Sequence, residues 1–221
     1  ISCVGSGARL TLFGRVAYNS ATGGGGGICA AGGCLVRLRS NVWLEGNQAD
    51  LGGGLFLAGS ARAENLGTGI ANLNIYENVA FSEGGGIYMA GTGPQTLLGN
   101  VRIVSNQAGE RGGGVALVGG ARLQVERFNF EQCLTAPRCV KINENSVDVG
   151  GFGSAVWADG GSEFRMARGY GEANTGPDFA TQSLFRAAGG GTGMLLEGVQ
   201  IAHNATQNLF VAETGAEIKA A

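Results

Sequence analysis

The chain has 221 residues, of which 44% are hydrophobic, so it is long and apolar enough to form a domain with a substantial core rather than a disordered tail. It carries 15 basic and 17 acidic side chains, and this net charge of −2 excludes the positive excess of a typical nucleic-acid-binding protein. The sequence contains no apolar run long enough for a membrane-spanning helix, so we expect no membrane span in this chain.

Glycine is the most unusual feature of the composition, with 43 residues against only 3 prolines. Collagen requires a strict Gly-X-Y period and abundant proline, and neither is present. A flexible glycine-rich linker would lack the Val, Ile, Leu and Phe residues that stand between these glycines. The composition therefore predicts a folded backbone that turns tightly many times, because glycine adopts turn conformations without a steric penalty.

The first recurring element is an aliphatic residue, two variable positions and an asparagine. It occurs at Val16-x-x-Asn19, Leu44-x-x-Asn47, Ile75-x-x-Asn78, Ile103-x-x-Asn106, Ile142-x-x-Asn145 and Ile201-x-x-Asn204. Asn174 fits the spacing, although Gly171 stands at its aliphatic position. With Asn174 included, successive asparagines are 28, 31, 28, 39, 29 and 30 residues apart, which indicates a repeat of nearly constant length.

The second element is a glycine triplet before a branched residue. Complete triplets precede Ile28, Leu55, Ile87 and Val115. The segment Gly150-Gly151-Phe152-Gly153 is a partial copy. In the last two units the triplet is lost, and only Leu184-Phe185 and Leu209-Phe210 indicate the start of a strand.

The third element is a stretch in which polar and apolar residues alternate, as in Ala121-Arg122-Leu123-Gln124-Val125. A period of two is typical of a strand with one buried face. The inward row is predicted to contain Leu10, Val36, Ala63, Leu98, Leu123, Phe164, Leu195 and Ile218. The outward row is predicted to contain Arg9, Arg62, Arg122 and Glu163.

Each unit is thus a series of short strands and turns without any helical period. A single unit of this kind cannot bury its apolar face, whereas stacked copies can. We therefore predict an all-β fold, a right-handed parallel β-helix (solenoid) of about seven coils, each of 28–31 residues. Residues 1–221 would form one domain, with an inserted loop around residues 130–141 that accounts for the interval of 39 residues.

The asparagines have a structural role in this prediction. Asparagine tolerates the left-handed backbone conformation of tight corners, and its amide can bond to the asparagine of the next coil. A ladder is therefore expected along one corner, formed by Asn19, Asn47, Asn78, Asn106, Asn145 and Asn204.

The five cysteines suggest two small disulfide loops in an oxidising compartment, Cys133 with Cys139 and Cys29 with Cys34. Stacking by one repeat also brings Cys3 near Cys29, so Cys3–Cys29 is a competing pairing. Five reduced, buried thiols are a further alternative. The cysteine pairs lack a second Cys-x-x-Cys or His partner, so we expect no zinc and no other metal site.

Enzymatic chemistry has little support in the residue pattern. Glycoside hydrolysis requires paired carboxylates, whereas the four aspartates are scattered along the chain. The single histidine, His203, has no nucleophile or carboxylate beside it in sequence and is interpreted as an exposed side chain at a turn. Asp148, Asp159 and Trp157 are the candidates for binding calcium or sugar. We predict no catalytic residues and no cofactor.

The glycine and asparagine tetrapeptides, for example Gly84-Gly85-Gly86-Ile87 and Ile75-x-x-Asn78, resemble the GGA[ILV] and FxxN repeats of chlamydial polymorphic outer-membrane proteins. That family belongs to the autotransporter class, whose passengers are β-helices exposed on the bacterial surface. The similarity extends from about Val16 to Asn204. It implies adhesion to a protein or glycan of a host or neighbouring cell.

The expected function is therefore that of a non-catalytic β-helix, secreted or on the bacterial cell surface, that acts as a structural stalk or adhesin. The alternative is a carbohydrate-binding or polysaccharide-degrading β-helix of the lyase or hydrolase kind. The chain starts with Ile1 rather than Met and shows no signal peptide, so we expect a mature chain or a piece of a larger protein.

Overall fold

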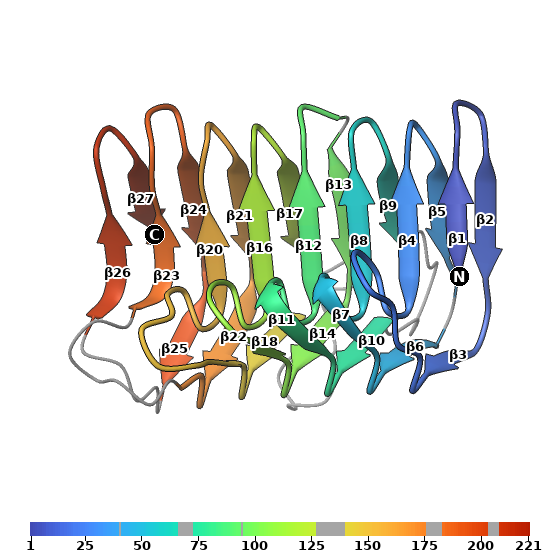
Figure 1. Cartoon of the computed structure of the whole chain (residues 1–221). Coiled ribbons are helices and arrows are strands. Elements are labelled where there is room, and N and C mark those ends of the chain that lie inside the picture. Colours follow the sequence, from blue (N-terminus) through green and yellow to red (C-terminus); the bar gives the residue numbers. More distant parts are fainter. Residues whose placement is uncertain (40, 66–72, 94, 127–139, 176–182, 203–207) are drawn as a thin grey trace.

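The computed structural model describes residues 1–39, 41–65, 73–93, 95–126, 140–175, 183–202 and 208–221, and this part of the chain contains strands and turns but no helix. Each coil contributes one strand to each of three long sheets, here named A, B and C, and several coils add a strand to a shorter sheet D. In Figure 1 the chain rises along sheet A at the front, returns along sheet B at the back, and advances from right to left. This path makes the coil right-handed, as the sequence predicted.

Sheets A and B have eight strands each and face one another across the core. Sheet A consists of β1 (Ser2–Val4), β4 (Ile28–Ala31), β8 (Leu55–Ala58), β12 (Ile87–Ala90), β16 (Val115–Val118), β20 (Val156–Ala158), β23 (Ser183–Ala187) and β26 (Asn208–Ala212). Sheet B consists of β2 (Arg9–Leu12), β5 (Leu35–Leu38), β9 (Arg62–Asn65), β13 (Thr96–Gly99), β17 (Arg122–Glu126), β21 (Glu163–Ala167), β24 (Gly193–Glu197) and β27 (Glu217–Ala220).

Sheets C and D close the lower side of the coil in Figure 1. Sheet C has seven strands, β3 (Arg15–Ala17), β6 (Val42–Glu45), β10 (Leu73–Tyr76), β14 (Val101–Val104), β18 (Val140–Asn143), β22 (Gly169–Glu172) and β25 (Gln200–Ala202). Sheet D has four strands, β7 (Gln48–Leu51), β11 (Val79–Glu83), β15 (Gln107–Ala108) and β19 (Ser146–Val147).

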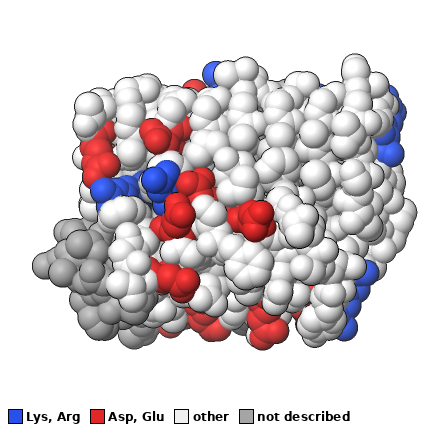
Figure 2. Space-filling view, in the orientation of Figure 1, with Lys and Arg blue, Asp and Glu red and all other residues white. Residues whose placement is uncertain are grey.

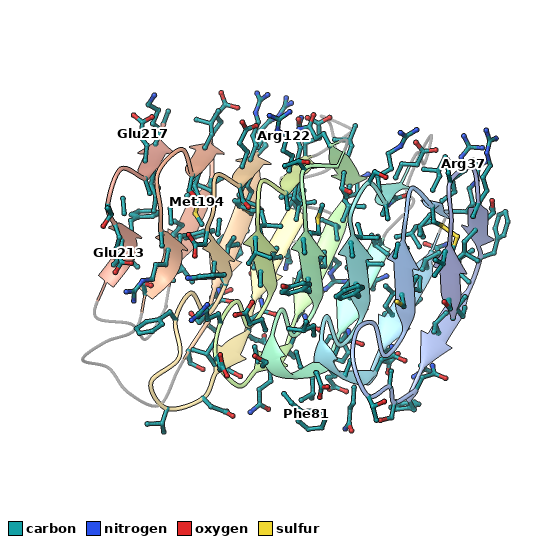
Figure 3. The ribbon with its side chains drawn as sticks, turned by 45° about the horizontal axis from the view of Figure 1, so that its top comes forward. Arg37, Phe81, Arg122, Met194, Glu213 and Glu217 are labelled. Carbon is teal, nitrogen blue, oxygen red and sulfur yellow. A yellow bond between two sulfur atoms is a disulfide. The ribbon has the colours of Figure 1, made fainter. Side chains whose placement is uncertain are left out.

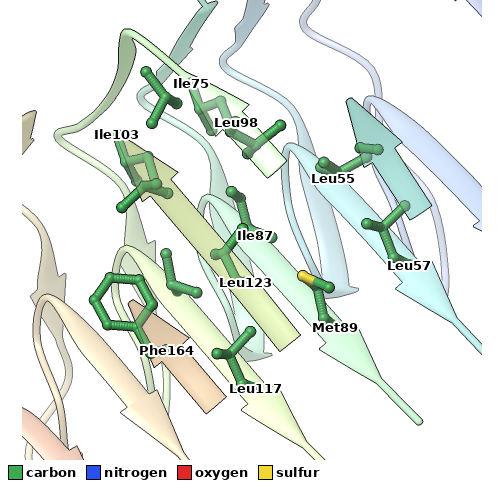
Figure 4. Packing of buried hydrophobic residues seen from close by; sticks show 14 of the residues in the cluster. Leu55, Leu57, Ile75, Ile87, Met89, Leu98, Ile103, Leu117, Leu123 and Phe164 are labelled. Carbon is green, nitrogen blue, oxygen red and sulfur yellow. The ribbon is translucent and has the colours of Figure 1, made fainter. Parts of the chain in front are cut away.

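All strand pairs are parallel, so equivalent residues of successive coils lie side by side. In sheet A, for example, Ile28 pairs with Leu55, Leu55 with Ile87, and Ile87 with Val115. All four side chains are fully buried. Inward rows from sheets A, B and C meet in one continuous core, a part of which is shown in Figure 4. Each fully buried Leu or Ile stabilises the fold by roughly 1.5–3 kcal/mol relative to an exposed one.

The predicted inward row of sheet B is correct in its first three members, Leu10, Val36 and Ala63, which pair in register. Leu123 and Phe164 pair in the same way. The assignment of Leu98 was wrong in row though not in face, because Leu98 pairs with Asn65 and Val125, two residues further along the strands.

The prediction for Leu195 was wrong in face. Leu195 pairs with Arg165 and Lys219 on the outer side, and Met194 occupies the inward position beside Phe164. An error of one residue inverts the face because side chains alternate along a strand. Because the glycine triplet is lost in this coil, its sequence does not indicate which residues of the strand face inward.

The predicted insertion around residues 130–141 falls mainly on residues 127–139, which lie outside the described residues. The last two residues of that range are not part of a loop. Val140 and Lys141 begin β18 and pair with Gly169 and Tyr170 of the next coil.

Candidate functional site

The predicted asparagine ladder runs along the corner between sheets C and D. Each Nδ2 donates a hydrogen bond to Oδ1 of the asparagine one coil later, and the nitrogen–oxygen distances are between 2.9 and 3.0 Å. The asparagines joined in this way are Asn19, Asn47, Asn78, Asn106, Asn145 and Asn174. Asn174 was left out of the predicted ladder because Gly171 broke the motif. Asn204, which was included, lies outside the described residues, as does His203.

Every internal asparagine of the ladder is fully buried and makes several further hydrogen bonds. Asn78 is representative, because its Nδ2 also donates to the carbonyl of Leu44, and its backbone N–H donates to Oδ1 of Asn106. Burying amides without hydrogen-bond partners would be unfavourable. Because the amides of the ladder have these partners, a row of asparagines can line the interior. The ladder is a structural element that fixes the register of the coils.

The left-handed residue of this corner is the one before the asparagine, which corrects the expectation that asparagine itself takes that conformation. Each of these preceding residues has a positive φ between 52° and 60°: Tyr18, Gly46, Glu77, Ser105, Glu144 and Ala173. Residues other than glycine adopt this left-handed backbone conformation at a penalty of about 1 kcal/mol or more. The hydrogen bonds of the neighbouring ladder asparagine offset that penalty.

The glycine triplets lie directly beside the ladder, between sheets D and A. The first glycine has a positive φ, for example +62° at Gly52. A Cβ on Gly53 would lie 2.5 Å from the carbonyl oxygen of Val79, and one on Gly54 would lie 3.0 Å from Nδ2 of Asn78. The triplet is therefore required for two reasons, the backbone conformation and the close approach of the next coil.

The degenerate copy of the triplet starts three positions later in the chain than the sequence suggested. Val115 pairs with Val156, so the glycines before Val115 correspond to Gly153-Ser154-Ala155. Gly153 keeps the positive φ of a first glycine, at +64°. Ser154 is fully buried, and its hydroxyl has no hydrogen-bond partner.

The disulfide of the described chain joins Cys3 to Cys34, with their Cα atoms 6.0 Å apart, and Cys29 carries a free thiol. Both predicted pairings of Cys29, with Cys34 and with Cys3, were therefore wrong. The reason is the register, because Cys3 pairs with Ala30 and Cys29 pairs with Ser2. Cys3 thus points into the core toward Cys34, whereas Cys29 lies on the outer face of sheet A. Cys133 and Cys139 lie outside the described residues.

Replacement of Cys34 by serine is expected to lower the free energy of unfolding by about 2–4 kcal/mol, because the bond closes a long loop between the first two coils. The measurement is urea unfolding followed by circular dichroism, with and without reductant. Cys29→Ser is the matched control and should change the unfolding midpoint little. If Cys29→Ser were the more destabilising variant, the assigned pairing would be incorrect.

The ligand candidates Asp148, Asp159 and Trp157 do not form a binding site together. Asp148 is exposed and accepts a hydrogen bond of 2.8 Å from Nε2 of Gln107. Asp159 accepts from the backbone N–H of Gly160 within a turn. Trp157 is only 4% exposed, so its ring is not available to stack on a sugar. Within the described segments, no three His, Cys, Asp or Glu side chains are grouped as metal ligands would be.

The ring of Trp157 belongs to an aromatic row on the outer face of sheet A. Phe56 and Tyr88 stack with their ring centroids 5.5 Å apart, and the Arg111 guanidinium carbon lies 4.6 Å from the centroid of Trp157. Arg111 also pairs with Glu83 at 3.1 Å. Figure 2 shows that charged side chains on this face gather over its C-terminal half. Because the rings are covered by neighbouring side chains, this row stabilises the solenoid from outside.

Glu83 makes the stability of this outer cluster dependent on pH. Burial raises the pKa of Glu83 above its ordinary value of 4.5, the charges of Glu110 and Asp159 raise it further, and Arg111 lowers it in part. A carboxyl whose pKa is raised by folding contributes stability that is fully present below the unfolded pKa and is lost as pH rises through the folded pKa.

We therefore expect the stability of Glu83→Gln relative to the wild type to be lowest at low pH. This relative stability should increase as pH rises from about 4 to 8. The measurement is the urea midpoint of both proteins across this range. Glu163→Gln, which removes an exposed carboxylate paired with Arg122 on sheet B, is the control. An unchanged difference between wild type and Glu83→Gln at all pH values would contradict the raised pKa.

The outer face of sheet B carries charges that are mostly paired between coils. Arg37 pairs with Glu64 at 2.7 Å, and Arg165 pairs with Glu197 at 2.7 Å. Figure 3 shows Arg37 and Arg122 pointing away from this sheet. Exposed pairs of this kind contribute little stability each, but they neutralise the face.

The outer face of sheet C presents a different set of side chains. Parallel pairing aligns five outward residues on successive strands, here named the sheet C row: Trp43, Asn74, Arg102, Lys141 and Tyr170. This row was not predicted as a unit from the sequence. Only the positions of its members repeat in the sequence, since each member directly precedes the first residue of the motif that ends in a ladder asparagine. The residue types at these positions do not repeat.

Comparison with known proteins gives no relative for this chain: no family model, no curated protein and no solved structure matches it. Within the described residues, none of the secondary structure is a helix of the length and apolarity needed to cross a membrane. Support for any function therefore comes from the geometry of the solenoid itself.

Proposed function

We propose that this chain is a non-catalytic extracellular or cell-surface solenoid that acts as a structural stalk or adhesin. The observation that carries the proposal is the unbroken in-register stacking of coils, marked by the ladder from Asn19 to Asn174. Such a ladder ties each coil to the next and produces a stiff, elongated scaffold with long outer faces. The Cys3–Cys34 disulfide is consistent with an oxidising compartment.

The partner of an adhesin of this kind would be a protein or glycan on a host or neighbouring cell. Beads coated with the chain are expected to attach to such cells, and soluble chain should compete with the attachment. Beads coated with the chain after reduction and unfolding are the control, because they carry the same composition without the solenoid. Absence of attachment and of competition would contradict the adhesin role.

The alternative function is that of a carbohydrate-binding or polysaccharide-degrading β-helix. One observation favours carbohydrate binding, namely the aromatic and cationic side chains of the sheet C row. Incubation of the chain with acidic and neutral polysaccharides separates the two forms. Release of new reducing ends or unsaturated products would establish degradation and would overturn the non-catalytic proposal.

A further inference from the structure

The sheet C row contains two cations side by side on neighbouring strands. Arg102 of β14 pairs in register with Lys141 of β18, and neighbouring strands are about 4.8 Å apart. Both side chains are half-buried. Asn74, which is buried, precedes them by one strand, and the half-buried Tyr170 follows them by one strand, so the four polar residues lie in one row.

These two cations lack the acidic partners that most of the other described cations have. Arg15, Arg37, Arg111, Arg165 and Arg186 each contact a carboxylate. Within the part of the chain that the structure describes, the side chains of Arg102 and Lys141 have no ion pair or hydrogen bond, and the buried Nε of Arg102 has no partner. Arg102 thus has a buried, unsatisfied donor, whereas Arg9 and Arg62, which also have no ion pair among the described residues, are exposed to water.

This arrangement is unfavourable for the isolated chain. Like charges opposite one another on adjacent strands destabilise a sheet, and an unpaired buried donor adds to that penalty. An anionic group that bridges the two cations would remove both penalties, because guanidinium and ammonium groups form strong hydrogen bonds with carboxylate and sulfate oxygens.

Aromatic side chains flank the two cations. Trp43 lies two strands before Arg102 and is 38% exposed, and Tyr170 lies one strand after Lys141. The distance from the strand of Trp43 to that of Tyr170 is about 19 Å, enough for several units of a linear polymer. An aromatic ring offers an apolar face for the C–H side of a sugar, while the cations bind its acidic substituents.

We propose that the sheet C row is a binding site for an acidic polysaccharide, whose chain lies along the solenoid across Trp43, Arg102, Lys141 and Tyr170. The inference rests on the proposed function as a surface adhesin and specifies the chemistry of its partner. Arg102 and Lys141 bind the carboxylate or sulfate groups, and the two rings bind the sugar faces.

The test is binding of the full chain to immobilised heparin, hyaluronate and neutral dextran, measured at increasing salt. Binding to one or both acidic polymers, weakened by salt, and not to dextran is expected, and the stronger acidic polymer tells sulfate from carboxylate. The double variant Arg102→Gln/Lys141→Gln should bind about tenfold or more weakly, since each lost charged contact contributes at the level of a tenfold change in affinity. Lys141→Arg, which keeps the charge, should retain binding.

The matched control is Arg9→Gln/Arg62→Gln, which removes the same charge from sheet B, where Leu35 separates the two arginines. It should change affinity less than about twofold if binding is local rather than due to net charge. The double variant of the row should also unfold at an equal or higher temperature than the wild type, because it removes a repulsion.

Equal loss in the sheet B control, equal binding of dextran, or equally tight binding of duplex DNA would overturn the inference. Bead attachment to cells that persists without any acidic-polysaccharide binding would refute this site and leave the adhesin role intact. Absence of both cell attachment and acidic-polysaccharide binding would refute the site and the adhesin role together.

Discussion

Substitution of Asn106 by leucine is expected to lower the free energy of unfolding by about 4 kcal/mol or more, or to prevent folding. The Nδ2 of Asn106 donates to Oδ1 of Asn145 and to the carbonyls of Ile75 and Val104. Its Oδ1 accepts from both the backbone N–H and Nδ2 of Asn78. Leucine leaves these buried groups unpaired, and each unpaired group is unfavourable by about 1–3 kcal/mol.

The control for this prediction is Asn19→Leu at the exposed start of the ladder. Asn19 also donates to Asn47, but it is exposed, so water can replace the missing partner. Urea unfolding followed by far-ultraviolet circular dichroism should show a loss of less than about 1.5 kcal/mol for this variant. Similar losses in both variants would mean that burial of the ladder does not determine its contribution.

The fold was predictable because two independent signals repeat with the same period. The asparagine of Ile75-x-x-Asn78 and the triplet Gly84-Gly85-Gly86 recur together, and each is required by the backbone of the neighbouring coil rather than by chance composition. A residue that must be the same in every coil leaves a period in the sequence. This requirement is the physical reason why the ladder and its corner could be located from the sequence.

Details that depend on a register of one residue were not predictable. The assignments of Leu195 and of the partner of Cys34 failed for the same reason, since a shift by one position exchanges the inner and outer faces of a strand. The position of the left-handed residue also failed. Intrinsic preference points to asparagine, but the ladder requires the asparagine side chain to point inward, and the preceding residue, such as Glu77, takes the positive φ instead.

The sheet C row was not predictable as a site for the opposite reason. Outward positions do not have to match their neighbours, so Trp43, Asn74, Arg102 and Lys141 show no repeat in residue type. Only the parallel pairing places Arg102 beside Lys141, although they are far apart in sequence. Binding residues on a solenoid therefore become visible once the register is known, whereas its structural residues are visible in the sequence alone.

Substitution of Gly53 by alanine is expected to be among the most damaging changes of a single methyl group in this chain. The new Cβ would lie 2.5 Å from the carbonyl oxygen of Val79 and 2.7 Å from that of Gly85. Both atoms belong to the backbone of the next coil, so no side-chain rotation can relieve the contact. The coils would have to separate locally, which would also strain the hydrogen bonds between Asn47 and Asn78.

We expect a loss of about 3 kcal/mol or more for Gly53→Ala, measured by urea unfolding, or a sharp fall in the soluble fraction. Gly193→Ala is the matched control, because Gly193 lies in β24 without a positive φ, and a Cβ there would meet nothing within 4 Å. Alanine at this position should change stability by less than about 1 kcal/mol, and it can stabilise by restricting the unfolded chain. Equal effects of the two substitutions would show that the glycines are needed for flexibility. A large effect at Gly53 alone would show that they are needed because two backbones approach more closely than any Cβ permits.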